Sequence, residues 1–296
     1  MVSPIFTIDF QAMASRCEIR LAAATCTEAR ALAEPALDEV RRIEAKYSRY
    51  RADSIVSRIN AAAGVSEVAC DDETLALLEY ADAVYRSSGG RFDITSGVLR
   101  KVWDFRMGTV PSPRSLEQLL PLVGWQQVRR EGGSVMLSRA GMELDFGGFG
   151  KEYAVDRAAE ILSAQGVQHG YVNLGGDMRF LGPRPDGEEW SIGIQHPRDT
   201  RSTVASVPFT RGALATSGDY ERYFEADGRR YCHILDPRNG MPVSYWRSVS
   251  VVSPMAISAG SCSTTAMLLQ RDGLEFLEQS GLSFLAIDQE GRIFRR

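Results

Sequence analysis

The 296-residue sequence predicts an α+β fold in which mixed or antiparallel sheets are flanked by helices. Apolar residues recur at helical spacing in the first third of the chain, and strand patterns dominate residues 168–253. Asp-Gly and Asn-Gly pairs in the second region are typical of tight turns between antiparallel strands. This order lacks the regular alternation of a doubly wound sheet. We therefore expect a single domain over residues 1–296, or two closely packed subdomains.

The amino-terminal third is expected to contain a hairpin and two helices. Residues 5–10 and 16–23 have strand patterns, and residues 28–47 and 72–88 carry apolar side chains at helical spacing. Pro35 should lie in the first turns of the earlier helix, where proline costs least. Residues 108–115, GTVPSPRS, should form a loop.

Strands dominate the rest of the predicted fold, with one helix before them and one near the end. The first helix is expected at 151–164, and Gly166 should end it. The second is expected at 259–270. The expected strands are 168–174, 178–181, 190–195, 204–208, 231–235, 247–253 and 283–288.

Composition and charge indicate an ordinary globular protein. Apolar residues make up 44% of the chain and charged residues 24%, which suffices for a real core. The net charge of −4, without runs of Lys or Arg, argues against binding to nucleic acid through a basic patch. No segment has the length and apolarity for membrane insertion, and the start lacks a secretory signal pattern. Five scattered cysteines fit a reducing compartment, so we expect a cytoplasmic location.

The stretch Met142–Asp156, MELDFGGFGKEYAVD, is the most informative candidate site. A short strand pattern leads through a Gly-rich turn into an amphipathic helix that starts at Lys151. Such a turn can present backbone N–H groups and one cation to a phosphate. A tight strand-to-helix turn with a solvated lysine explains the same residues about equally well.

Four later motifs are further candidates. Asn173–Asp177 carries two glycines that permit close approach of a ligand, although a bulge or turn also uses them. Thr216–Gly218 offers hydroxyls to a phosphate or flavin ring, although a plain turn is the commoner role. His233–Gly240 offers a proton acceptor, or a strand histidine satisfied by its neighbours. Ser258–Thr265 opens the last helix, where hydroxyls most often serve as caps.

Taken in order, these motifs resemble those of the FAD:protein FMN transferase (ApbE) family, and the likeness extends over nearly the whole chain. Earlier segments that also resemble the family are Phe10–Ser15, Tyr47–Arg51, Asp53-Ser54, Ile59-Asn60 and Gly90–Thr95 with Trp103. The resemblance implies an ApbE-like fold. It also implies an enzyme that binds FAD and Mg²⁺, moves FMN to a Thr or Ser hydroxyl of an acceptor flavoprotein, and releases AMP.

Two alternatives to this transferase interpretation stay open. A catalytically weak or inactive relative would bind FAD, or hydrolyse it as a pyrophosphatase does. An interaction protein would keep the fold and lose the ligand. The pyrophosphate of FAD concentrates negative charge, so a transferase should surround it with a cation and backbone N–H donors.

The resemblance also assigns residues. His233 is the expected base for the acceptor hydroxyl, and Asp236 is a second catalytic candidate that orients the reacting groups. The expected FAD-binding residues are Met13, Tyr50, Asn60, Asp93, Lys151, Gly175, Gly176, Asp177, Ser217, Gly218 and His233. The expected Mg²⁺ ligands are the backbone carbonyl of Gly150 and the side chain of Thr264.

Two positions depart from the family pattern. The family has glycine where this chain has Glu152, which adds a negative charge beside the expected phosphate site. The family has a metal-binding aspartate where this chain has Gly260, although Thr264 is retained. Because a hard cation prefers anionic oxygen, we expect weaker Mg²⁺ binding, with Glu152 or the charge of FAD as candidates for compensation. On this account Gly260→Asp should tighten Mg²⁺ binding.

Overall fold

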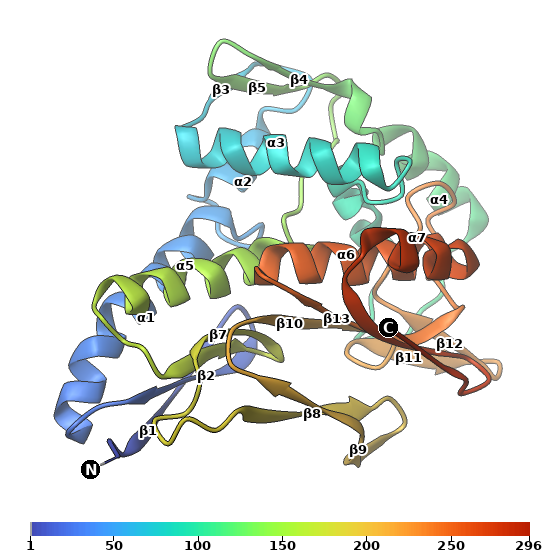
Figure 1. Cartoon of the computed structure of the whole chain (residues 1–296). Coiled ribbons are helices and arrows are strands. Elements are labelled where there is room, and N and C mark those ends of the chain that lie inside the picture. Colours follow the sequence, from blue (N-terminus) through green and yellow to red (C-terminus); the bar gives the residue numbers. More distant parts are fainter. Residues whose placement is uncertain (1) are drawn as a thin grey trace.

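An eight-stranded antiparallel sheet forms the centre of the computed structural model, which describes residues 2–296. The α+β prediction is confirmed, because every neighbouring pair of strands in this sheet runs antiparallel and helices flank it (Figure 1). In spatial order the strands are β1 (Ile5–Ala12), β2 (Ser15–Ala22), β6 (Gly170–Leu174), β7 (Asp177–Gly182), β10 (Gly212–Gly218), β13 (Trp246–Ser253), β14 (Ser283–Asp288) and β15 (Ile293–Arg295).

Helices cover one face of this sheet and a hairpin covers the other (Figure 1). The covering helices are α1 (Cys26–Tyr47), α5 (Gly150–Ala164), α6 (Ala256–Leu269) and α7 (Gly273–Ser280). The hairpin of β8 (Trp190–His196) and β9 (Asp199–Phe209) lies on the opposite face. There Phe209 stacks on Phe180 of β7 with ring centroids 4.3 Å apart. The sheet is therefore buried on both sides, which suits its apolar strands.

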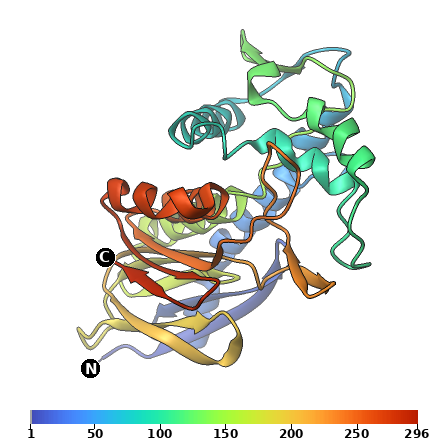
Figure 2. The same cartoon turned by 90° about the vertical axis from the view of Figure 1, so that its right-hand side faces the viewer.

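The remaining elements lie beyond the helical layer, on the side away from the sheet (Figures 1 and 2). They are α2 (Ile55–Ala61), α3 (Asp72–Ser87), a 3-10 helix (Ile94–Lys101), α4 (Pro113–Leu119) and a small sheet of β3 (Val68–Ala69), β5 (Ser134–Leu137) and β4 (Val128–Glu131). One cluster of buried apolar side chains runs through both parts, from Ile19 and Val249 in the sheet to Leu77 and Trp125. The division into one domain or two subdomains stays a prediction.

α6 is buried around most of its circumference, because it lies between the sheet and its neighbouring helices. Its sequence AISAGSCSTTAMLL contains only small or apolar residues, which let the backbone approach β10 and β13 closely. A helix without a polar face is expected only in such a buried position. The α6 side chains nearest the sheet are consequently held in fixed places.

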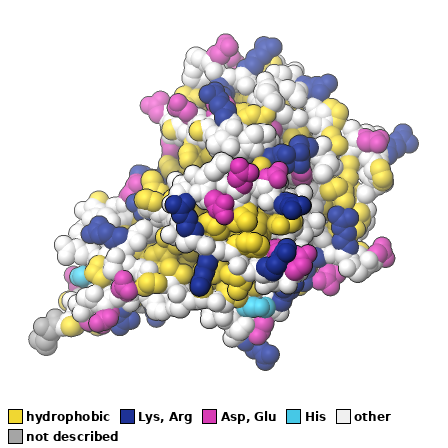
Figure 3. Space-filling view, turned by 45° about the vertical axis from the view of Figure 1, so that its right-hand side comes forward, with side chains coloured by type: hydrophobic (Ala, Val, Ile, Leu, Met, Phe, Trp, Pro, Cys, Tyr) yellow, Lys and Arg dark blue, Asp and Glu magenta, His cyan; other side chains and the backbone are white. Residues whose placement is uncertain are grey.

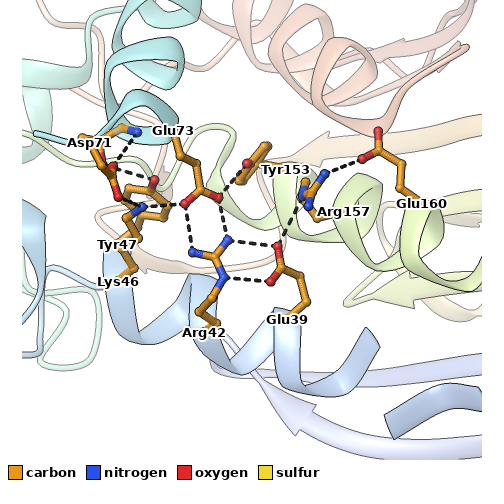
Figure 4. Close-up of polar contacts among 10 residues, drawn as sticks. Glu39, Arg42, Lys46, Tyr47, Asp71, Glu73, Tyr153, Arg157 and Glu160 are labelled. Carbon is orange, nitrogen blue, oxygen red and sulfur yellow. Dashed lines mark hydrogen bonds and ion pairs between the residues drawn. The ribbon is translucent and has the colours of Figure 1, made fainter. Parts of the chain in front are cut away.

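A network of charged and polar side chains joins α1, α3 and α5 (Figure 4). Glu73 of α3 accepts hydrogen bonds from Arg42 of α1 at 2.6 Å and from the Tyr153 hydroxyl of α5 at 2.7 Å. Arg157 of α5 in turn bonds Glu39 of α1 at 3.2 Å. The network ties α5 to elements on both sides of it.

Several boundaries differ from the sequence predictions. Pro35 lies in the interior of α1, because that helix starts at Cys26, capped by Thr25. Pro35 and Ala31 are exposed, so water can bond the carbonyl that proline leaves free. α4 begins at Pro113, within the segment expected to be a loop. The β11 (Tyr223–Ala226) and β12 (Arg229–Cys232) hairpin ends before His233, which was expected inside a strand.

Among residues 2–296, no helix is long and apolar enough to cross a membrane. The molecular face in Figure 3 shows hydrophobic atoms near its centre, and both signs of charge are mixed around them. Neither positive nor negative side chains form a dominant patch on that face.

Candidate functional site

The start of α5 has the form that the sequence predicts for an anion-facing turn. Phe149 occupies the N-cap position and gives no side-chain hydrogen bond to the first turn of the helix. A helix start of this kind leaves backbone N–H groups for water or an anion. The preceding turn is tightly packed, since a Cβ at Gly148 would lie 2.8 Å from the Phe92 ring. The glycines thus bring the backbone itself to the surface of the site.

Lys151 extends from this first turn to Asp177. Its Nζ lies 2.9 Å from Asp177 Oδ2, and Asp177 is buried at the start of β7. The other carboxylate oxygen of Asp177 accepts the backbone N–H of Thr216 in β10 at 3.4 Å. Burial alone would lower the pKa of Lys151, but the charge of Asp177 outweighs it and raises that pKa above its ordinary value. Lys151 is therefore a cation held in place at the start of the central strand β7.

Two hairpin turns lie beside this ion pair. Met13 and Ala14 connect β1 and β2 with φ of 50° and 56°, and Gly175 and Gly176 connect β6 and β7 with φ of 61° and 97°. A Cβ at Gly175 would lie 2.8 Å from the Ser15 side chain and 3.5 Å from Lys151 Nζ. Glycine is needed here for both its positive φ and its lack of a side chain.

Three hydroxyls join β10 to α6 next to these turns. The Ser217 hydroxyl lies 2.8 Å from that of Ser263 and 2.9 Å from that of Thr264. Ser217 was expected to bind FAD and Thr264 to bind the metal, so the structure brings one residue of each predicted group into direct contact. Gly218 ends the strand, where a Cβ would lie 2.4 Å from the Tyr220 ring.

Glu152 points from α5 at the backbone of α6. A Cβ built on Gly260 would lie 2.5 Å from Glu152 Oε1 and 2.6 Å from its Cγ. Glu152 is only 7% exposed, and its Oε2 has no hydrogen-bond partner in the described part of the chain. Burial, followed by the charge of Asp177, raises the pKa of Glu152 to about 8, against the opposing effect of Lys151. An unpaired acceptor this deeply buried calls for a cation or a proton.

His233 follows directly after β12 and is partly exposed. Its backbone N–H donates to the Arg222 carbonyl at 3.0 Å, while its buried Nδ1 has no hydrogen-bond partner among residues 2–296. Burial, together with the charges of Arg100 and Arg222, lowers the pKa of His233 to about 4. The imidazole is therefore neutral near pH 7 and has a nitrogen free to accept a proton.

Asp236 is buried in the next turn, where it binds its own segment. Both of its carboxylate oxygens accept hydrogen bonds from Arg238, at 3.1 Å and 2.8 Å, and its backbone N–H donates to Met241. No hydrogen bond joins the side chains of Asp236 and His233 in the described residues. Asp236 shapes the loop after His233, and its catalytic role stays a prediction.

Four predicted FAD-binding residues lie apart from the Lys151–Asp177 pair or are occupied by protein partners. The Met13 N–H donates to Glu44 at 2.7 Å, and Tyr50 is 80% exposed on a loop. The Asn60 amide exchanges two hydrogen bonds with the backbone of Leu144. Asp93 caps the 3-10 helix and accepts the Trp125 N–H. Their contacts with FAD stay predictions.

Sequence reasoning missed the part played by Asp156, the last residue of the central motif. Its two carboxylate oxygens accept the N–H groups of Ala256 and Ile257, each at 2.9 Å, and Arg179 pairs with it at 2.7 Å. A side chain of α5 therefore caps α6, whose own N-cap residue, Met255, makes no such bond. Spacing along the sequence gave no signal, because the partner lies 100 residues away.

The groups that could bind a metal ion at this site are oxygen atoms: a backbone carbonyl, a hydroxyl and a carboxylate. Among residues 2–296, no three His, Cys, Asp or Glu side chains gather as a metal cluster. A carbonyl, a hydroxyl and one carboxylate nevertheless suit Mg²⁺, which keeps several waters and often uses substrate phosphates as ligands. The unpaired Oε2 of Glu152 beside Gly260 is a buried acceptor that a cation would satisfy. The residues present therefore fit Mg²⁺.

A cavity of about 370 Å³ lies elsewhere, on the β8–β9 side, and is lined by Arg20, Tyr171, Arg184 and Trp190 among others. None of the predicted site residues lines it. The candidate site is instead the exposed edge where Lys151, the two hairpin turns and the start of α5 meet.

Comparison with known proteins gives a consistent family. A sequence model of the ApbE family matches residues 13–286. FAD:protein FMN transferases of Treponema pallidum (strain Nichols) and Klebsiella pneumoniae (strain 342) are 34% and 36% identical over 241 and 229 residues. These matches cover 75% of this chain in both cases, and 67% and 71% of the relatives.

Solved structures agree with the sequence matches. The crystal structure of the ApbE protein from Thermotoga maritima has a TM-score of 0.90 and 32% identity, covering 99% of this chain and 97% of that one. The apo flavinyl transferase ApbE of Pseudomonas stutzeri has a TM-score of 0.85 and 29% identity, with 99% and 93% covered. The chain belongs to the ApbE family.

Proposed function

We propose that this protein is an FAD:protein FMN transferase that moves FMN from FAD to a Thr or Ser hydroxyl of an acceptor flavoprotein and releases AMP. The observation that carries the proposal is that Lys151–Asp177, the turns at 13–14 and 175–176, and the Ser217–Thr264 contact lie at the same end of neighbouring strands. The names of the two similar curated relatives support the same reaction.

Lys151 and the start of α5 would bind the pyrophosphate of FAD. Asp177 holds the lysine ammonium in place, so little side-chain entropy is lost when the anion arrives. The backbone N–H groups of the first turn add donors that need no reorganisation. Ser217 and Gly218, on the adjacent strand, would lie near the flavin part of the molecule.

His233 would accept the proton of the acceptor hydroxyl at a ring nitrogen. The hydroxyl oxygen then forms a bond to the phosphorus on the FMN side, and the bond to the AMP oxygen breaks. A base with a pKa of about 4 is weak, but that value applies to the protein without FAD. The negative pyrophosphate would offset the nearby Arg100 and Arg222 charges and raise the pKa toward the working range.

The carbonyl of Gly150 and the hydroxyl of Thr264 would hold Mg²⁺. When bound, the ion would polarise the phosphoryl oxygens and stabilise the leaving AMP. Gly150 begins α5 and Thr264 lies on the facing side of α6, where its hydroxyl already contacts Ser217. The cytoplasmic location stays a prediction alongside the Mg²⁺ requirement.

The proposal is tested with purified protein, FAD, Mg²⁺ and a flavin-accepting domain. We expect AMP release and covalently bound flavin on the acceptor, both abolished by EDTA. AMP and free FMN without labelled acceptor would favour the pyrophosphatase alternative. Retained yellow colour without AMP release would favour the FAD-binding alternative, and no flavin affinity would favour the interaction protein.

A further inference from the structure

We propose that Glu152 supplies the carboxylate ligand of the divalent cation in this protein, and that Gly260 is its required partner because it leaves space for the Glu152 side chain. The inference rests on the proposed function, since the same cation would serve FAD cleavage. It places the anionic ligand on α5, whereas the family pattern has it on α6.

The first support is the unpaired oxygen of Glu152. The side chain is more than nine-tenths buried, yet Oε2 has no hydrogen-bond partner in the described residues. The neighbouring residue Lys151 is a cation, but it is paired with Asp177 at 2.9 Å. A carboxylate buried without a partner is strongly destabilising when it is ionised, so a bound cation would stabilise the ionised form of Glu152.

The second support is steric. A Cβ at Gly260 would lie 2.5 Å from Glu152 Oε1, 2.6 Å from Cγ and 2.8 Å from Cδ. A real Cβ does not come this close to atoms it is not bonded to, so any side chain at residue 260 would force the Glu152 side chain out of this position. Carboxylates at both positions would compete for the same space between α5 and α6.

The third support is the set of oxygens nearby. Thr264 lies one helical turn after Gly260, on the same face of α6. Its hydroxyl contacts Ser217 at 2.9 Å, and Gly150 lies two residues before Glu152 in the first turn of α5. Hydroxyl, carbonyl and carboxylate oxygens are the ligands that Mg²⁺ and Mn²⁺ prefer.

The two helices that carry these groups are fixed to one another. Asp156, one turn after Glu152 on α5, accepts the N–H groups of Ala256 and Ile257 at the start of α6. Gly260 lies one turn beyond those residues. The position of Glu152 against Gly260 is therefore set by a buried hydrogen-bonded link.

This geometry changes the expectation for Gly260→Asp. The added side chain would overlap Glu152, so the single exchange should fail to tighten metal binding and should destabilise the fold. Tightening requires the simultaneous removal of the Glu152 side chain. We therefore expect metal binding when either residue 152 or residue 260 carries a carboxylate, and weak metal binding when both or neither do.

The test is Mn²⁺ titration of the full chain by calorimetry in the absence of FAD, with wild type, Glu152→Gln, Gly260→Asp and the double variant Glu152→Gly/Gly260→Asp. We expect Glu152→Gln to weaken Mn²⁺ binding by roughly 10- to 100-fold. The double variant should return to within about fivefold of wild type, because its aspartate enters the vacated space. Glu160→Gln, an exposed acid on the same helix, is the matched control and should bind as wild type does.

Thermal unfolding of each variant checks that it folds, and the double variant should be more stable than Gly260→Asp alone. The inference is overturned if Glu152→Gln binds Mn²⁺ as tightly as wild type, if the double variant stays as weak as Glu152→Gln, or if wild type binds no Mn²⁺. AMP release is measured separately. If the wild type transfers FMN but Glu152→Gln binds Mn²⁺ as tightly as the wild type, only this inference fails. If Mn²⁺ binding depends on Glu152 but the wild type releases no AMP, only the proposed function fails.

Discussion

Although His233 is partly exposed, burial around its ring and the charges of Arg100 and Arg222 lower its pKa to about 4. In the unfolded chain a histidine has its ordinary pKa of about 6.5. The unfolded state therefore binds more protons between these values, so this residue lowers the stability of the folded state as the pH falls below about 6.5. The same low pKa keeps the imidazole neutral and able to accept a proton near pH 7.

We predict that His233 titrates near pH 4 in the FAD-free protein and at a higher pH once FAD is bound. The shift has a simple cause, because the pyrophosphate offsets the charges of the neighbouring arginines. Proton NMR of the imidazole resonances measures it, with His233→Gln used to assign the signal. That variant should lose roughly 10²- to 10⁴-fold in transfer rate, because it lacks the ring nitrogen that would accept the hydroxyl proton. An ordinary pKa of about 6.5 without FAD would contradict this account.

At the residue level, sequence patterns indicate which residues lie together only where one motif supplies the neighbours. Lys151 and the Gly175-Gly176 turn are recognisable because glycines and a helix start mark them locally, and the structure brings them together. The hydrogen bonds of Asn60 with Leu144 join residues 84 positions apart, and no local pattern reveals them. The unpaired oxygen of Glu152 likewise depends on α6, far along the chain.

At the scale of elements, the α5–α6 pair carries the candidate site. α5 presents Lys151 and Glu152 from its first turn, and α6 presents Thr264 from its third. Asp156 joins the two helices through a carboxylate that caps α6 and pairs with Arg179. A negative group at a helix N-terminus is favoured by the helix dipole as well as by its hydrogen bonds.

We predict that Asp156→Ala lowers the free energy of unfolding by roughly 3 kcal/mol, because it leaves two N–H groups uncapped and Arg179 without its partner. Urea denaturation followed by circular dichroism measures the change. Asp72→Asn, an exposed acid in the first turn of α3, is the control and should stay within about 0.5 kcal/mol of wild type. Equal stability of Asp156→Ala and the control would show that α6 does not depend on this cap.

Elements with a clear apolar pattern were predictable from sequence, and short helices were not. The helix expected at 151–164 is observed as Gly150–Ala164, and the strand expected at 283–288 has those bounds. α2 and α7 span seven and eight residues, which is too few turns for a clear apolar period. Pro35 was placed wrongly because α1 extends further toward the N-terminus than its apolar stripe indicates.

At the scale of the whole molecule, the network around Glu73 joins the sheet-covering helices to the elements beyond them (Figure 4). The hydrogen bond from Arg42 lowers the pKa of Glu73 well below its ordinary value, and Lys46 and Tyr153 add to this effect against burial. A depressed carboxylate pKa stabilises the folded state above the unfolded pKa of about 4.3, and that stabilisation is lost as the pH falls below it.

We predict that Glu73→Gln destabilises the protein by about 1–2 kcal/mol at pH 6, and that the difference shrinks as the pH is lowered to 3. Denaturation curves at a series of pH values measure it. Glu34→Gln removes an exposed ion pair with Arg41 and should change stability by less than about 0.5 kcal/mol at every pH. A Glu73→Gln effect that stays constant between pH 6 and 3 would contradict the proposed electrostatic origin.

For the whole molecule, the fold class and the family could be predicted from the sequence. The order of helices and strands indicated α+β, and motifs spread over the chain indicated the ApbE family. The strand order and the placement of α6 against α5 depend on contacts between distant segments, which periodicity does not specify. For that reason the coupling of Glu152 to Gly260 could be argued only from the structure.

The most direct test of the central claim is intact-mass measurement of a flavin-accepting domain after incubation with this protein, FAD and Mg²⁺, with AMP quantified in the same sample. Transfer predicts one added FMN per acceptor, less one water, with one AMP released for each labelled chain. Replacing the acceptor threonine or serine by alanine should remove both products. An acceptor of unchanged mass, with FAD left intact, would contradict the account.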